Sequence, residues 1–344
     1  MMKHTAIFLS VLLLAQPLVV QAAGGDGVKA YHARNMRKHG VPSGGYSGIA
    51  YLGGDSFAIV SDCHTTDAVR ILHLDINPRS GKLRHVSLSS SQPVLTAGGG
   101  ALAKVPDYED VAFVSQTATF FLVSEASGSV SEYALTGKAT GKSLLLENLF
   151  PKGCFQSGYG IESLAYDERN KVFWLTSEAS LTTDAQLPYG TLRLWSVPDG
   201  TAQPRLFRYQ MDSLRWTEGA WHIHGVSALL ATGDGRLLVM EREVSVPKGY
   251  VGAKTHTSIY EVVPGEGQTP TDFASSQPLP KRLLWAFDTR LKVGRLNFAN
   301  SEGMCFGPRL NDGRQTLILV SDSQNAKGNA FYRLKDYLKV VVLP

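Results

Sequence analysis

Acidic residues recur along this chain in one local setting, at the ends of short apolar runs. Five of these acids close the second of two paired runs: Asp62, Glu125, Glu178, Glu241 and Asp322. Three more open the first run, namely Glu109, Glu162 and Glu302. Oxygen-rich groups of this kind suit Ca²⁺, which takes six to eight oxygen ligands with tolerant geometry. A single acid at a strand end more often caps a turn, but recurrence in the same slot favours a shared site.

The acids belong to a unit that recurs five times: a small or acidic residue, an apolar run, a turn, and a second apolar run ending in an acid. The copies span residues 47–62, 109–125, 162–178, 226–241 and 302–322. Two further strand-like segments follow each copy. Four strands per irregular repeat predict an all-β, single-domain β-propeller with five visible blades. A sixth blade could lie between Glu241 and Asp322 or be built from the chain ends, and the alternative fold is a β-sandwich.

A propeller would bring the acids together. The first strand of a blade lines the central channel and the second runs antiparallel to it, so the start of one and the end of the other lie at the same edge. We therefore expect all eight acids around one channel mouth. Their mutual repulsion requires protons, a basic partner or a bound cation. Arg242 directly follows Glu241, although alternation along a strand would point it away from the Glu241 face unless the strand has ended there.

Other reactive residues give weaker signals. His222 and His224 share a face of an extended segment and could ligate a metal, but paired surface histidines are commoner. Ser47 lacks the glycine spacing of a nucleophile elbow. Export would permit a disulfide between Cys63 and Cys154. Cys305 lies inside an expected inner strand, and we expect it to be a small buried hydrophobic residue.

Composition narrows the class of protein. The 344 residues are 43% hydrophobic, which excludes a disordered chain. The 34 basic and 30 acidic residues leave a net charge of +4, and the bases are scattered, which argues against nucleic-acid binding. A basic start, an apolar stretch over residues 6–20 and Val20-Gln21-Ala22 predict a signal peptide over residues 1–22. We expect residues 23–344 to be an exported domain, periplasmic or secreted, monomeric and without a membrane span.

Several segments resemble a known family. They are residues 44–51 with Ser61-Asp62, 108–112 with Ser124-Glu125, 161–165, 235–242, and 300–308 continuing through 312–314 and 317–322. Together they resemble the secreted phytase-like propeller family described as "esterase-like activity of phytase", over nearly the whole mature chain. The resemblance implies a propeller fold and phosphoesterase activity. The Asp-Ala-Asp-Asp-Pro-Ala segment of propeller phytases is absent, which argues against phytate itself.

These observations lead to a hypothesis of calcium-dependent phosphoester hydrolysis of a small molecule at the acidic mouth. Glu162 and Glu302 are the expected catalytic acids, with Arg242 as a phosphate clamp. The expected metal ligands are drawn from the recurring acids: Asp62, Glu109, Glu125, Glu162, Glu178, Glu241, Glu302 and Asp322. The alternatives are lactone or carboxylic-ester hydrolysis on a similar propeller, and a non-catalytic periplasmic binding propeller whose acids are structural.

Overall fold

The regular secondary structure of the described residues is almost wholly β-strand. The computed structural model describes residues 27–62, 69–102, 107–125, 127–265, 273–292, 295–296, 298–324, 326–328 and 333–344. The expected signal peptide, residues 1–22, and Cys63 lie outside these residues. Within these ranges, helix is confined to three short 3₁₀ segments: η1 (Met36–His39), η2 (Thr182–Asp184) and η3 (Phe273–Ser275). No helix among the described residues is long and apolar enough to cross a membrane.

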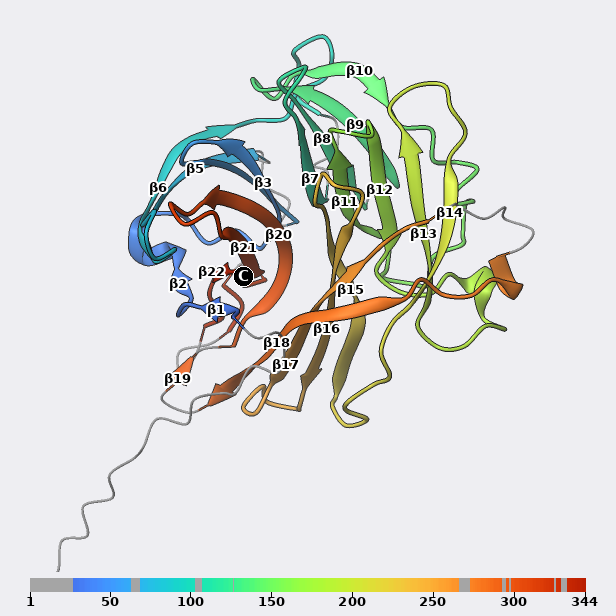
Figure 1. Ribbon diagram of the computed structural model, residues 1–344. Coiled ribbons are helices and arrows are strands. Elements are labelled where there is room, and N and C mark those ends of the chain that lie inside the picture. Colours follow the sequence, from blue (N-terminus) through green and yellow to red (C-terminus); the bar gives the residue numbers. More distant parts are fainter. Residues whose placement is uncertain are drawn as a thin grey trace, which may run out of the picture.

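The strands form five antiparallel sheets, the blades of a propeller (Figure 1). Blade 1 contains β3 (Tyr46–Gly53), β4 (Ser56–Ser61), β5 (Val69–Ile76) and β6 (Leu83–Gln92). Blade 2 contains β7 (Tyr108–Val114), β8 (Thr119–Ser124), β9 (Ser129–Ala134) and β10 (Ala139–Ser143). Blade 3 contains β11 (Ile161–Asp167), β12 (Val172–Ser177), β13 (Thr191–Pro198) and β14 (Arg205–Gln210).

Blades 4 and 5 complete the ring. Blade 4 contains β15 (Trp221–Ala231), β16 (Leu237–Val246), β17 (Lys254–Val262) and β18 (Lys281–Lys292), extended by β19 (Arg295–Leu296). Blade 5 contains β20 (Asn300–Arg309), β21 (Gln315–Asp322) and β22 (Tyr337–Val342), with β1 (Lys29–Ala30) and β2 (Arg34–Asn35) paired to β22. The described chain ends therefore complete blade 5. The predicted propeller is confirmed, and it has five blades.

The inner strands β3, β7, β11, β15 and β20 each contact the next in a closed ring, which places blade 5, in orange and red, beside blade 1, in blue (Figure 1). The second strands are buried nearly throughout because both faces of a blade pack against neighbours, which explains their continuous apolar runs. Across one such contact the rings of Phe121 and Phe173 lie 4.5 Å apart, centroid to centroid.

One glycine allows the inner strands to approach closely at the end of the channel where the acids lie. A Cβ atom on Gly48 would lie 2.6 Å from Oδ1 of Asp110 on the next blade. Asp110 is itself buried and accepts backbone hydrogen bonds from Val111 and, across blades, from Leu164, each at 2.8 Å. The glycine and the aspartate together fix the spacing of three inner strands.

Candidate functional site

Each inner strand carries a β-bulge, and the bulge carries a potential functional side chain. The register with the second strand shifts around Ser47, Glu109, Glu162, Ser227 and Glu302. A bulge adds one residue to one strand and re-aims its side chain. In blades 2, 3 and 5 the extra residue is a glutamate, so the repeat delivers these three carboxylates from equivalent positions on the channel wall.

The strand pairing corrects the alignment of the fourth repeat. Val226 pairs with Glu241, as Ile161 pairs with Ser177 in blade 3. Arg242 therefore occupies the slot that Glu178 fills in blade 3. A one-residue shift in a strand moves a side chain to the opposite face. The expectation that Glu241 joins the channel acids is wrong for this reason.

Glu241 has a separate, buried environment. Its carboxylate accepts hydrogen bonds from the Tyr209 hydroxyl at 2.6 Å, the Lys281 ammonium at 2.6 Å and the backbone N–H of Asp212 at 3.0 Å. Burial raises the pKa of Glu241, and Lys281 opposes the rise. These bonds give Glu241 a role in holding segment 212–215 against blade 4.

Arg242 is the buried cation of the channel mouth, with only 5% of its surface exposed. Its Nη2 donates to Oε1 of Glu178 at 2.5 Å, and its Nη1 donates to Glu302 and, at 2.9 Å, to Oδ1 of Asn300. Burial alone would lower the pKa of Arg242, but Glu302 and Glu178 outweigh it and hold that pKa above its ordinary value. Blade 4 thus supplies a permanent positive charge between carboxylates of blades 3 and 5.

Glu109 and Glu162 are two buried carboxyl groups that lie close together. Burial raises the pKa of Glu109 well above its ordinary value, and the charges of Glu162 and Asp62 add to the rise. Burial likewise raises the pKa of Glu162; Glu178 adds to this, while Arg242 and a hydrogen bond with Glu109 oppose it. Two carboxyl groups can share a hydrogen bond only if one of them carries a proton. The pair is therefore suited to holding and moving a proton.

A third group of acids lies on blade 2. Asp107, Glu109 and Glu125 each offer one carboxylate oxygen, and these three oxygens lie within 4.8 Å of one another. The backbone N–H of Glu125 donates to the carbonyl of Asp107 at 2.9 Å, which ties the two strand ends together. Sequence reasoning missed Asp107. Its position two residues before Glu109, on the same side of an extended segment, is a signal that could have found it.

The remaining acids of blades 1 and 5 lie close to this set. Burial raises the pKa of Asp322 well above its ordinary value, and the Asp62 charge adds to it. Burial also raises the pKa of Glu302, opposed by Arg242 and reinforced by Asp322. Asn300, two residues before Glu302, donates to its carboxylate at 2.5 Å and was likewise not predicted. Seven of the eight expected acids are thus brought together: Asp62, Glu109, Glu125, Glu162, Glu178, Glu302 and Asp322.

The weaker sequence candidates have other partners. Nε2 of His222 lies 2.8 Å from Glu243, and Nδ1 of His224 lies 3.2 Å from the Tyr189 hydroxyl, so the two histidines use their nitrogens separately. Ser47 donates to the carbonyl of Tyr108 at 2.6 Å, a contact between blades. Cys154 and Cys305 are buried free thiols, whereas Cys63 lies outside the described residues.

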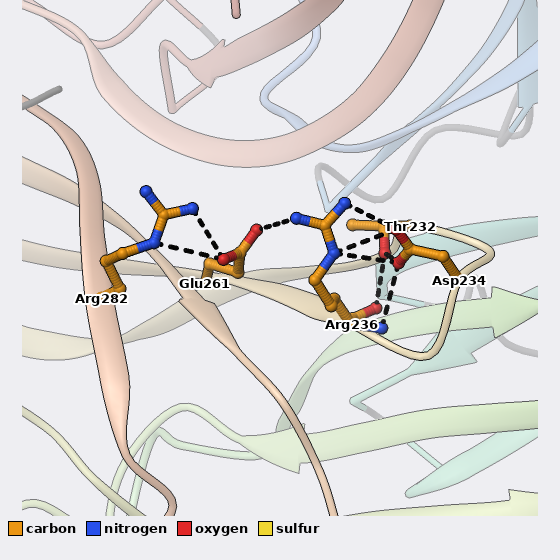
Figure 2. A network of polar contacts seen from close by, with 5 residues as sticks. All are labelled: Thr232, Asp234, Arg236, Glu261 and Arg282. Atoms are coloured by element: carbon orange, nitrogen blue, oxygen red, sulfur yellow. Dashed lines mark hydrogen bonds and ion pairs between the residues drawn. The ribbon is translucent and has the colours of Figure 1, made fainter. Parts of the chain in front are cut away.

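An exposed network provides a contrast to the buried one. Arg236 bonds to Asp234 and Glu261, and Arg282 also bonds to Glu261 (Figure 2). The side chain of Arg236 is 43% exposed, against 6% for that of Arg242. Both arginines contact two carboxylates, but only Arg242 does so away from water, where charge pairing is strong and an unpaired charge is costly.

Comparisons with known proteins give one family match and several distant structural likenesses. The family described as "Phytase-like: Esterase-like activity of phytase" matches residues 41–324. A structural genomics protein of unknown function from Bacteroides thetaiotaomicron is 9% identical with a TM-score of 0.41, covering 94% of this chain and 77% of that one. The periplasmic gluconolactonase of Pseudomonas aeruginosa is 12% identical with a TM-score of 0.33, covering 86% of this chain and 73% of that one.

The extracellular domain of a protein described as a one component system from B. thetaiotaomicron is 14% identical with a TM-score of 0.33 and covers 86% of this chain. The chain spans 27% of the length of that structure and 35% of a second structure of the same domain, described there as part of a hybrid two component system. No curated protein matches the chain significantly. The match of the family description to residues 41–324 covers most of the sequence. The chain belongs to the phytase-like family.

Proposed function

We propose that this protein is a metal-dependent hydrolase that cleaves a phosphoester of a small molecule at the channel mouth. One observation carries the proposal: carboxylates of blades 3 and 5 bond to a single buried guanidinium, Arg242, and acids of blades 1 and 2 lie close to these carboxylates. Membership of the phytase-like family supports the same reaction class. Buried acids with raised pKa values destabilise a fold, and groups of this kind cluster at binding and catalytic sites.

The residues fit a hard divalent cation. Their donors are carboxylate oxygens, which Ca²⁺ prefers, and their negative charge exceeds what Arg242 neutralises. Asp107, Glu109 and Glu125 are the residues that would hold the ion, because their oxygens already lie within 4.8 Å of one another. When bound, such an ion neutralises phosphate oxygens and lowers the pKa of a water molecule.

The side chains of the chain itself have distinct roles in this proposal. Arg242 binds a phosphate oxygen through its guanidinium, and Glu302 and Asn300 hold that guanidinium in place. Glu162 accepts the proton of the attacking water, since a raised pKa brings a carboxylate close to the range in which general bases work near neutral pH. Glu109, hydrogen-bonded to Glu162, shares this proton.

The test combines metal analysis with a phosphoester panel. The protein is purified, its metal content is measured by mass spectrometry, and hydrolysis of p-nitrophenyl phosphate and bis-p-nitrophenyl phosphate is followed with and without EGTA. We expect Glu109→Gln to lose both hydrolysis and the calcium-dependent rise in melting temperature.

The matched control is Glu132→Gln. Glu132 is equally buried but lies on β9, where it accepts hydrogen bonds from Thr119 and Thr140 at 2.8 and 2.6 Å. We expect Glu132→Gln to keep the calcium-dependent rise in melting temperature. Turnover of lactones but of no phosphoester would instead select the lactonase alternative, and ligand-induced melting shifts without hydrolysis of any ester would select a binding propeller.

We also propose that the protein acts outside the cytoplasm, after cleavage following residue 22, and as a monomer. The basic and apolar start of the sequence supports the first part. N-terminal sequencing of the protein recovered from a periplasmic or secreted fraction, with size-exclusion chromatography coupled to light scattering, tests both. An N-terminus at Met1 in the recovered protein would contradict the cleavage.

A further inference from the structure

A second polar pocket, of about 230 Å³, lies on one face of blade 4. Its polar lining includes Asp212, Arg215, His224, His256, Ser258 and Tyr260. Segment 212–215 lies over this face of the sheet, held by the bonds from Asp212 and Arg215 backbone N–H groups to Glu241 and Glu243. Arg242 of the phosphoester proposal also lines this pocket, but that proposal makes no use of its other side chains.

The strand register of blade 4 places three of its polar side chains in a fixed order. His256 on β17 pairs directly with Asp288 on β18. Side chains of directly paired residues lie on the same face of a sheet, and so do those of residues two apart on one strand. Ser258 therefore shares a face with both His256 and Asp288, and the sheet itself holds the three side chains in a row.

The contacts within this row are those of a nucleophile, its base and an orienting acid. Oγ of Ser258 lies 2.9 Å from Nε2 of His256, and Nδ1 of His256 lies 2.6 Å from Oδ1 of Asp288. An acid at Nδ1 fixes the tautomer that leaves Nε2 free to accept the hydroxyl proton, and such an array is recognised by geometry on unrelated folds. We propose that Ser258, His256 and Asp288 form a metal-independent serine esterase site.

Arg215 completes the site with a positive charge. Its Nη1 lies 2.7 Å from Nδ1 and 2.6 Å from Nε2 of His256, so the guanidinium rests against the imidazole that the Ser258 hydroxyl also contacts. Tyr260, which lines the same pocket, also hydrogen-bonds to Ser258. A guanidinium in this place can donate to the oxyanion that forms when a carbonyl carbon is attacked, and we assign Arg215 that role.

The reaction follows from these positions. Oγ of Ser258 attacks the carbonyl carbon of an ester while Nε2 of His256 takes the hydroxyl proton. The carbon–oxygen bond to the leaving group breaks, and His256 returns the proton to the departing alcohol. Water then attacks the acyl-serine with His256 as base, which releases the acid and restores the serine. The pocket is smaller than the roughly 300 Å³ at which sites for drug-sized ligands begin, so we assign it short-chain carboxylic esters, such as acetates.

The experiment uses an active-site probe on the whole protein in EGTA, which separates this site from the phosphoester proposal. A fluorophosphonate probe is added, and labelling is measured by intact mass and then by peptide mapping; hydrolysis of p-nitrophenyl acetate is followed in parallel. We expect one label per chain on Ser258, no label on Ser258→Ala, and a loss of about 10³-fold or more in acetate hydrolysis for both Ser258→Ala and His256→Gln.

The control variant is Ser89→Ala, an exposed serine on β6 of blade 1, away from the pocket, which should label and turn over as the unaltered protein does. Mapping the label on the unaltered protein needs no variant, so the test holds even if Ser258→Ala fails to fold. Absence of labelling under conditions that fully label a known serine esterase overturns the proposal, as does a label on any other residue. Loss of phosphoester hydrolysis in EGTA with labelling retained would separate the two sites.

Discussion

Replacing Arg242 with glutamine should destabilise the protein strongly, because the guanidinium is the buried partner of two carboxylates. Arg242 is 5% exposed, and the Glu178 and Glu302 side chains that it contacts are 4% and 11% exposed. Removing one partner of a buried ion pair costs about 3–5 kcal/mol, mostly because a charge is left unpaired away from water. Glutamine keeps much of the side-chain length but none of the charge.

The expected shift in melting temperature follows from the size of the domain. With an unfolding entropy of about 2.1 cal/mol/K per residue and about 300 folded residues, each kcal/mol corresponds to about 1.6 °C. Arg242→Gln should therefore melt about 5–8 °C lower. Arg236→Gln is the control, since Arg236 also contacts two carboxylates but is 43% exposed. Surface pairs contribute about 0–1 kcal/mol, so its shift should stay below about 2 °C.

Differential scanning calorimetry of both variants, without calcium at pH 7.5 and at pH 5, measures these shifts. At pH 5 the deficit of Arg242→Gln should shrink, because the raised pKa of Glu302 lets that carboxyl group take a proton once the guanidinium is gone. Equal shifts for Arg242→Gln and Arg236→Gln would refute the reasoning. So would a deficit that does not depend on pH.

Three further predictions concern the same part of the molecule. First, burial raises the pKa values of Glu109, Glu302 and Asp322, so the folded state binds protons that the unfolded state releases. Without calcium, the free energy of unfolding should therefore fall as the pH rises from the ordinary carboxyl range towards neutrality. Denaturant titrations at several pH values measure this free energy, and a rise with pH would contradict the prediction. Second, saturating Ca²⁺ should flatten that pH dependence, because the cation replaces the protons; calorimetry with and without EGTA measures it, and unchanged curves would count against the site. Third, Gly48→Ala should cost about 1–3 kcal/mol, since its Cβ would lie 2.6 Å from Oδ1 of Asp110; chemical denaturation measures it, and a neutral substitution would mean that the blades can move apart.

The sequence was sufficient for the propeller and for most of the channel acids, because both follow from a repeat. Every copy pairs an apolar run with a closing polar residue, so Glu162 and Glu302 could be placed at equivalent positions. The prediction for the fourth copy was wrong because three charged residues follow one another there, Glu241-Arg242-Glu243. No sequence pattern says which of them occupies the closing position of the repeat. The pairing of Val226 with Glu241 decides it.

Residues outside the repeated hairpin could not be predicted in the same way. Asp107 precedes its strand, and only the fold brings its carboxylate to Glu125. His256 and Asp288 lie on the outer strands of blade 4, more than thirty positions apart in the sequence, and meet through strand register alone. A short motif carries no information about such a pairing. Sequence repetition predicts equivalent positions, whereas contacts peculiar to one blade require the structure.

The closure of blade 5 has a consequence for how the protein reaches its folded state. Lys29 and Ala30 pair with Val342 and Val341, so residues at opposite ends of the described chain share one sheet. Contacts of such long sequence separation form slowly, since the entropy of closing the intervening loop must be overcome first. Until β1 and β2 dock, the outer edge of β22 offers unpaired backbone groups to other chains. Loss of the first strands, by proteolysis or truncation, should therefore turn a closed ring into a chain prone to edge-to-edge aggregation.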